Sequence, residues 1–140
     1  MTLIGKYTID MIKLASPESR KTSCNYCRLM SLDKMKCEPC RGGVPTLTDA
    51  EINQFYSQLQ RWSVVEKNGI KRLERSFDFE DFVGALAFTN NVGELAEREG
   101  HHPDILTEWG RVTVSWWTHK IGGLHKNDFI MAAKTDGLIP

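Results

Sequence analysis

The sequence lacks the features that mark several large classes of protein. Its 140 residues contain 18 Lys and Arg residues against 18 Asp and Glu residues, so the net charge gives no general attraction to nucleic acid or to an anionic membrane. No apolar run approaches the roughly 20 residues of a membrane-spanning helix, and the first residues lack the apolar centre of a secretory signal. We therefore expect a soluble, cytoplasmic protein with no membrane or nucleic-acid partner.

Signatures of common enzyme classes are absent as well. The chain has no G-x-G-x-x-G dinucleotide fingerprint, no P-loop, no H-E-x-x-H zinc motif and no G-x-S-x-G nucleophile motif. Its length suits one domain with one hydrophobic core. Any chemistry must therefore be sought in the two clusters that the sequence does contain, one of cysteines and one of histidines.

All the cysteines lie in the first third of the chain, in two C-x-x-C pairs, CNYC and CEPC; they are Cys24, Cys27, Cys37 and Cys40. Four thiolates can form a structural zinc site, which makes zinc a possible ligand here. Unliganded thiols remain an alternative, and two disulfides are less favoured in a reducing cytosol. We interpret residues 1–44 as an N-terminal extension, because the Gly- and Pro-containing stretch RGGVP separates them from a regular domain over 45–140.

Residues 45–99 predict a helix, a hairpin and a second helix. Thr48 is a suitable N-cap with Glu51 three residues later, which indicates a helix start. Asn68-Gly69 suits a type I′ turn between two strands rich in Val, Ile, Leu and Phe. From residue 80 to 99, apolar or small residues recur at helical spacing, namely Phe82, Ala85, Leu86, Thr89, Val92 and Ala96.

The remainder predicts two strands and a closing helix. Strands are expected over 104–109 and over 111–119, with His119 at the end of the second one, on its polar face. A helix follows from about residue 125, with Asp128 in its first turn. The order α-β-β-α-β-β-α is typical of an α+β domain in which a four-stranded antiparallel sheet carries helices on one face.

His101 and His102 are adjacent and lie just beyond the second helix. Gly100 suits a left-handed helix terminator, and Pro103 keeps His102 out of helical geometry, so the pair is expected on a turn. Three interpretations compete: a metal site, histidines exposed on the surface, and a proton-transfer site completed by His119. Side chains of adjacent residues diverge, which disfavours joint metal binding, whereas imidazoles titrate near neutral pH and suit proton transfer.

The motif residues resemble those of the pterin-4a-carbinolamine dehydratase family. The resemblance covers roughly residues 45–138, and CEPCRGGVP is similar to the lead-in of some plant and bacterial members. It is carried by E-x-x-x-H-H-P, by WTH, by GGL and by NDF, which contain Glu97, His101, His102, Pro103, His119 and Asp128, with Trp109 between the first two motifs. The chain differs from the family pattern at His125, a position where the family commonly has a Thr or Ser helix cap.

The resemblance implies a hydro-lyase that removes water from 4a-hydroxytetrahydropterin in tetrahydrobiopterin recycling, with no metal or redox cofactor. It implies that His101, His102 and His119 surround the pterin, with His101 as a general acid or base and His102 more concerned with binding. Glu97 would orient an imidazole, and Asp128 would accept a ring N–H from His119. The other implied substrate contacts are Pro103, a pocket wall from Trp109, and backbone groups around Trp117 and Thr118 that would hold the amide and amino edge of the pterin.

Members of this family also act as protein-binding modules, so a dimerisation or assembly role is the alternative function. The exposed edge strand of such a sheet can pair with another chain, which makes a homo-oligomer, either a dimer or a tetramer, the expected state.

Overall fold

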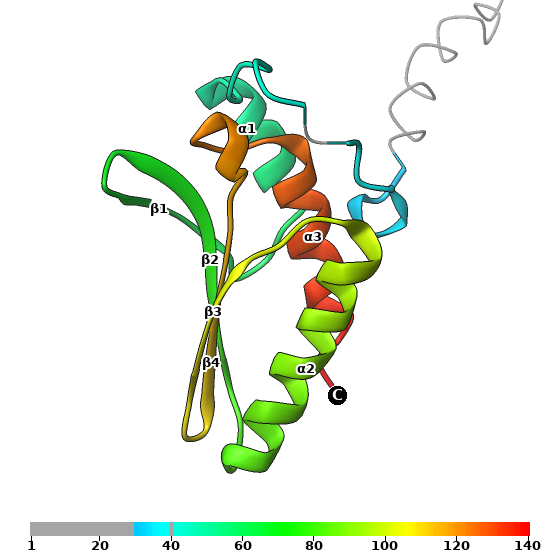
Figure 1. The fold of residues 1–140 in the computed structure, drawn as a ribbon, viewed down its shortest axis with the longest axis vertical. Helices are drawn as coiled ribbons and strands as arrows, with labels where there is room; N and C mark the ends of the chain where they lie inside the picture. Colours follow the sequence, from blue (N-terminus) through cyan, green and yellow to red (C-terminus); the bar gives the residue numbers. More distant parts are fainter. Residues whose placement is uncertain (1–29, 40) are drawn as a thin grey trace, which may run out of the picture.

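The computed structural model describes residues 30–39 and 41–140. Figure 1 shows a single sheet with helices packed against it. In chain order the elements are η3 (Leu32–Lys34), α1 (Asp49–Tyr56), β1 (Ser63–Lys67), β2 (Ile70–Asp78), α2 (Phe82–Glu99), β3 (Asp104–Glu108), β4 (Arg111–Trp116), η4 (His119–Ile121) and α3 (Lys126–Asp136).

The sheet is antiparallel throughout and has the strand order β1-β2-β4-β3. The predicted α+β class is therefore confirmed, with α2 and α3 on the same face of the sheet (Figure 1). In the β1–β2 hairpin Asn68 and Gly69 have φ of 55° and 74°, and positive φ at both positions is what a type I′ turn requires. Thr48 and Glu51 form the expected capping box of α1.

The core lies between the sheet and the helices. Alternate residues of β2 and β4 point toward the helices and are buried: Leu73, Phe77, Val112, Val114 and Trp116. The helical stripe predicted for α2 was partly wrong, because Phe82 and Leu86 are 45% and 44% exposed while Phe88 and Leu95 are buried. Ala85, Val92 and Ala96 belong to both stripes, and the steps of three and four residues through Phe88 and Leu95 define the face that packs inward.

Strand β4 is shorter than the sequence predicted. It ends at Trp116, and His119 begins the 3₁₀ turn η4 instead of closing the strand. The reason is local: the Thr118 N–H donates to the Gly123 carbonyl at 2.9 Å, and Gly122 adopts φ of 64°, so the chain folds back on itself. His119 is therefore exposed on a turn next to the end of the sheet.

The residues before α1 pack on the domain. Leu32 of η3 is part of the core, and η3 contacts α3. We call residues 37–39 and 41–47 the lead-in segment. At its far end Leu47 N–H donates to the Leu124 carbonyl at 2.9 Å, and Gly123 leaves room for Thr46. Within residues 30–39 and 41–140, no helix is long and apolar enough to cross a membrane.

Candidate active site

His101 is the buried member of the histidine cluster. Helix α2 ends at Gly100, whose φ of 64° is the predicted left-handed terminator, and the His101 N–H then donates to the Ala96 carbonyl at 3.2 Å. The imidazole is only 5% exposed. It stacks on the Trp116 indole, with ring centroids 5.7 Å apart and an interplanar angle of 12°, so its plane is fixed by the sheet beneath it.

Asp128 anchors the His101 ring. This carboxylate lies in the first turn of α3 and is fully buried. Its Oδ1 is 2.6 Å from His101 Nε2, and its Oδ2 accepts hydrogen bonds from Thr118 Oγ1 at 2.9 Å and from the His125 N–H at 2.8 Å. The prediction that Asp128 accepts a ring N–H from His119 was wrong, because its two oxygens contact His101, Thr118 and His125. Asp128 in the first turn of α3 meets His101, just past the end of α2, whereas His119 lies on the exposed η4 turn.

His102 and His119 are the exposed members of the cluster. His102 Nε2 is 2.8 Å from Glu97 Oε1, so Glu97 orients an imidazole one helical turn after its own position, as a carboxylate in that place can. The His119 ring stacks on Trp117 with centroids 3.8 Å apart. Trp117 is in turn held by Arg72, whose guanidinium lies 4.4 Å above the indole, and by Asp104, which accepts its Nε1–H at 3.3 Å.

All three histidines line one cavity of about 540 Å³. The residues around it are Pro39, Gly100, His101, His102, Thr118, His119 and Lys120. One buried imidazole with a fixed carboxylate partner and two exposed imidazoles therefore face the same space. Such a set can exchange protons with a bound molecule at near-neutral pH.

Of the implied substrate contacts, Thr118 lines this cavity, whereas the others lie outside its lining: Glu97, Pro103, Trp109, Trp117 and Asp128. Trp109 is 75% exposed and occupies the turn between β3 and β4. That turn is at the opposite end of β3 from the histidines (Figure 1), roughly 16 Å away along a five-residue strand. Within one chain Trp109 therefore does not reach the histidine cavity, because β3 runs away from the histidine turn; a pocket wall from Trp109 stays a prediction. Pro103 is half-buried just before β3.

The backbone of Thr118 is already used inside the protein. Its N–H donates to Gly123, and its carbonyl accepts from the N–H groups of Ile121 and Gly122 at 3.3 and 3.0 Å. The hydroxyl donates to Asp128. Thr118 thus connects β4, η4 and α3 through hydrogen bonds. The resemblance implied that its backbone contacts a ligand, and such a contact would compete with these bonds.

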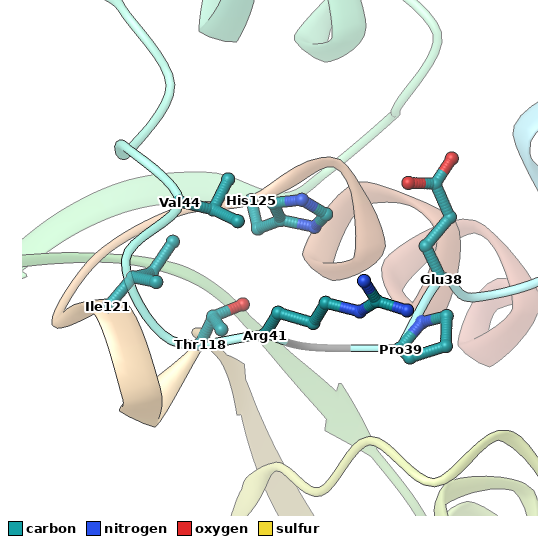
Figure 2. Close-up of a pocket in the computed structure, with 7 residues that line it drawn as sticks. All are labelled: Glu38, Pro39, Arg41, Val44, Thr118, Ile121 and His125. Carbon is teal, nitrogen blue, oxygen red and sulfur yellow. The ribbon is translucent and has the colours of Figure 1, made fainter.

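The sequence interpretation missed the lead-in segment as part of the site. Pro39 lines the histidine cavity, and a second cavity of about 340 Å³ adjoins it. Figure 2 shows the residues around this second cavity, which are Glu38, Pro39, Arg41, Val44, Thr118, Ile121 and His125. The stretch CEPCRGGVP could have indicated this, because it resembles the lead-in of some family members. The sequence analysis instead assigned it to the N-terminal extension and its boundary.

Glu99 holds the start of the lead-in segment against α2. Its Oε2 accepts the Cys37 N–H at 3.3 Å, and its other oxygen pairs with Lys134. The Lys134 ammonium is the main reason that the pKa of the Glu99 carboxyl lies below its ordinary value, and the Cys37 N–H lowers it further. The carboxylate is therefore charged at neutral pH and fixes both α3 and the lead-in segment.

The possible zinc site lies largely outside the described residues. Cys24, Cys27 and Cys40 are not among them, so only Cys37 is placed, half-buried beside Glu99. Among the residues that are described, no group of three or more His, Cys, Asp or Glu side chains could hold a metal ion. Zinc binding by the four cysteines stays a prediction.

Comparisons with known proteins bear on the family of this chain. A family model described as Pterin 4 alpha carbinolamine dehydratase matches residues 45–138. The chain is 59% identical over 107 residues to a provisionally named pterin-4-alpha-carbinolamine dehydratase of Chlorobium limicola, which covers 76% of this chain and 95% of that protein. A provisionally named counterpart from Microcystis aeruginosa is 53% identical over 110 residues, covering 79% and 95%.

A solved structure supports the fold independently. The crystal structure of a transcriptional coactivator/pterin dehydratase from Brucella melitensis superposes with a TM-score of 0.61 at 33% identity, and the match covers 66% of this chain and 97% of that one.

Proposed function

The chain belongs to the pterin 4 alpha carbinolamine dehydratase family, and we propose that it catalyses the dehydration of 4a-hydroxytetrahydropterin to quinonoid dihydropterin, supporting tetrahydrobiopterin recycling. In this reaction the C4a–O bond breaks, N5 loses its proton, a C4a=N5 double bond forms and water leaves. Hydroxide is a poor leaving group, so the step needs a general acid at the hydroxyl and a general base at N5. The observation that carries the proposal is the buried, carboxylate-anchored His101 facing the same cavity as His102 and His119.

His101 is the proposed general base. Because Asp128 Oδ1 lies 2.6 Å from Nε2 and can accept a hydrogen bond there, it favours the imidazole tautomer with its proton on Nε2. Exchange with the substrate then uses Nδ1, whose lone pair takes the N5 proton. The Asp128 carboxylate balances the positive charge that develops on the ring, as the buried aspartate does in serine protease triads.

His119 is the proposed general acid. It lies exposed on the η4 turn, stacked on Trp117, and lines the same cavity as His101. An imidazolium there can protonate the departing hydroxyl. His102, held by Glu97, has a mainly binding role in this scheme.

No metal or redox cofactor takes part in the proposed reaction. The electron pair of the N5–H bond forms the new C4a=N5 bond and the C4a–O pair leaves with water, so electrons and atoms balance within the substrate. The protein supplies proton transfer, orientation and exclusion of water.

The test is the rate of carbinolamine dehydration, followed by absorbance after rapid generation of the substrate. Replacing either member of an acid–base pair is expected to lower kcat by about 10²- to 10⁴-fold. We expect losses in this range for His101→Ala and His119→Ala, and a change mainly in KM for His102→Ala. The matched control is Glu94→Gln on the exposed side of α2, which should leave kcat and KM unchanged.

Two results would contradict the proposal. Wild-type protein that leaves the dehydration at its spontaneous rate would remove the enzymatic function and favour the protein-binding alternative. Full activity in both His101→Ala and His119→Ala would remove the acid–base assignment, because the proposal gives the two proton transfers to these two imidazoles.

We also propose that the protein is a homo-oligomer. Apolar side chains are exposed on the N-terminal half of α2 and on the edge strand β3, namely Phe82, Val83, Leu86 and Leu106. Exposed apolar patches and unpaired edge strands are typical of self-association surfaces. Sedimentation equilibrium should give a mass two or four times the 16.0 kDa of one chain; a monomer at micromolar concentration would contradict this.

A further inference from the structure

The cavity of the lead-in segment adjoins the histidine cavity. The two share Pro39 and Thr118 in their linings. A flat molecule that binds against His101 and His119 therefore has the second cavity beside it, across the shared residues Pro39 and Thr118. No step of the proposed dehydration uses the second cavity, so its residues need a separate explanation.

The backbone beneath this cavity is held rigidly. The fully buried Asn127 side chain forms a two-bond clamp on Glu38: the Glu38 N–H donates to Asn127 Oδ1 at 3.0 Å, and Asn127 Nδ2 donates to the Glu38 carbonyl at 2.7 Å. Asn127 adjoins Asp128, the anchor of His101. The position of Glu38 is thus coupled to the position of the proposed base by two consecutive residues of α3.

Two opposite charges border the second cavity, and the clamp fixes the backbone of one of them, Glu38. Figure 2 shows the Glu38 carboxylate and the Arg41 guanidinium on its right-hand side, on either side of an open space that His125 also borders. The ion pairs found within residues 30–39 and 41–140 include neither of these side chains. An anionic acceptor and a cationic donor therefore border the same space without neutralising each other by direct contact.

We propose that Glu38 and Arg41 bind the amino–amide edge of the pterin ring, an inference that rests on the proposed function. This edge presents two donors, the 2-amino group and N3–H, followed by one acceptor, the 4-oxo group. A carboxylate can accept from two N–H groups at once, and a guanidinium has N–H donors but no acceptor. Glu38 thus matches the donor part of the edge, and Arg41 matches the 4-oxo group.

The same charge pattern argues against other occupants of the second cavity. An anionic substituent would be attracted by Arg41 but repelled by Glu38. A purely apolar substituent would leave both charges partly desolvated without a partner, which is costly. A group with donors and an acceptor side by side uses both residues, and the pterin edge is such a group.

The test compares two fluorescent ligands that differ at one position. Pterin carries a 2-amino group, and lumazine carries a 2-oxo group in its place, so the donor that Glu38 would accept from becomes an acceptor. We expect wild-type protein to bind pterin at least about tenfold more tightly than lumazine. Glu38→Gln should reduce or reverse this preference, because the amide N–H₂ can donate to the 2-oxo group.

Arg41→Met provides a second, different signature. The 4-oxo group is present in both ligands, so this variant should weaken both by a similar factor, about tenfold, and keep the preference for pterin. The matched control is Lys36→Met, which removes a cation just before the lead-in segment and outside both cavity linings. It should leave both affinities unchanged.

The outcomes separate this inference from the proposed function. Equal preference for pterin in wild type and Glu38→Gln would overturn the Glu38 contact even if dehydration is fully catalysed. A swap of preference in a protein that fails to accelerate dehydration would support the contact while removing the catalytic proposal. A loss of both affinities in Glu38→Gln without any change in their ratio indicates a role in shaping the cavity only, and also overturns the inference.

Discussion

Replacing Asp128 by Asn tests the link between the buried carboxylate and the proposed base most directly. Oδ2 of Asp128 accepts two hydrogen bonds, from Thr118 Oγ1 and from the His125 N–H, while Oδ1 faces His101 Nε2 at 2.6 Å. An amide has one oxygen, and the two donors hold it on the Oδ2 side. Its N–H₂ group then faces His101, which must respond by accepting a hydrogen bond at Nε2.

The consequence is a change of tautomer. With Nε2 as acceptor, the His101 proton moves to Nδ1, and the lone pair proposed to take the N5 proton is lost. General base catalysis contributes about 10²- to 10⁴-fold, so we expect kcat to fall within that range. The stability cost is smaller, about 1–3 kcal/mol, because a hydrogen bond to a charged group is replaced by a neutral one.

Three measurements on Asp128→Asn test whether His101 is the base and whether its tautomer changes. Dehydration kinetics give kcat, urea unfolding gives the free energy of unfolding, and the ¹⁵N shifts of the His101 ring report which nitrogen carries the proton. The control, Thr118→Val, removes one bond to Asp128 without touching the His101 contact, so it should cost kcat less than about tenfold. A variant Asp128→Asn with the proton moved to Nδ1 and wild-type kcat would refute the assignment of His101 as base.

Two further predictions concern the lead-in segment. The pKa of Glu99 is lowered mainly by Lys134, so the stabilisation from this carboxylate is complete above its unfolded pKa of about 4.3 and is lost as the pH falls through the lower folded pKa. Urea unfolding should therefore show that Glu99→Gln is about 1–3 kcal/mol less stable than wild type at pH 7. This difference in the free energy of unfolding should shrink below about pH 4. An undiminished difference in acid would contradict this. A Cβ on Gly123 would lie 2.5 Å from Thr46 Cγ2, so Gly123→Ala should lower the urea midpoint of unfolding. Adding Thr46→Ser removes that methyl group and should restore most of the lost midpoint. A double variant that is no more stable than Gly123→Ala would show that the strain does not come from Thr46.

The order of the elements was predictable because each signal in the sequence was local. The Thr48–Glu51 capping box and the Asn68-Gly69 turn depend on a few consecutive residues whose chemistry permits little else. The inward face of α2 was harder, because Phe82, Leu86 and Phe88 are all apolar and only the packed sheet determines which of them is buried.

The partner of Asp128 was mispredicted for a similar reason. Residues 119 and 128 are close in sequence, and a strand running to His119 would have brought the two together. The bond from Thr118 N–H to Gly123 ends the strand earlier and turns His119 outward. The carboxylate instead meets His101, 27 residues away, which is a pairing that depends on how α2 and α3 pack and that no spacing rule contains.

The contribution of the lead-in segment was missed because its polar residues show no periodicity. A stretch with two glycines and a proline is normally a linker, and nothing in its sequence indicates that Glu38 will be clamped by the buried Asn127. The clamp becomes understandable from α3: Asn127 follows the capping residue His125, whose Nδ1 accepts the Asn127 N–H at 3.2 Å. That cap fixes the backbone at the helix start, and the buried Asn127 amide requires hydrogen-bond partners. The backbone of Glu38 supplies these partners. The same residue that pairs with the buried amide of α3 therefore also lines the second cavity.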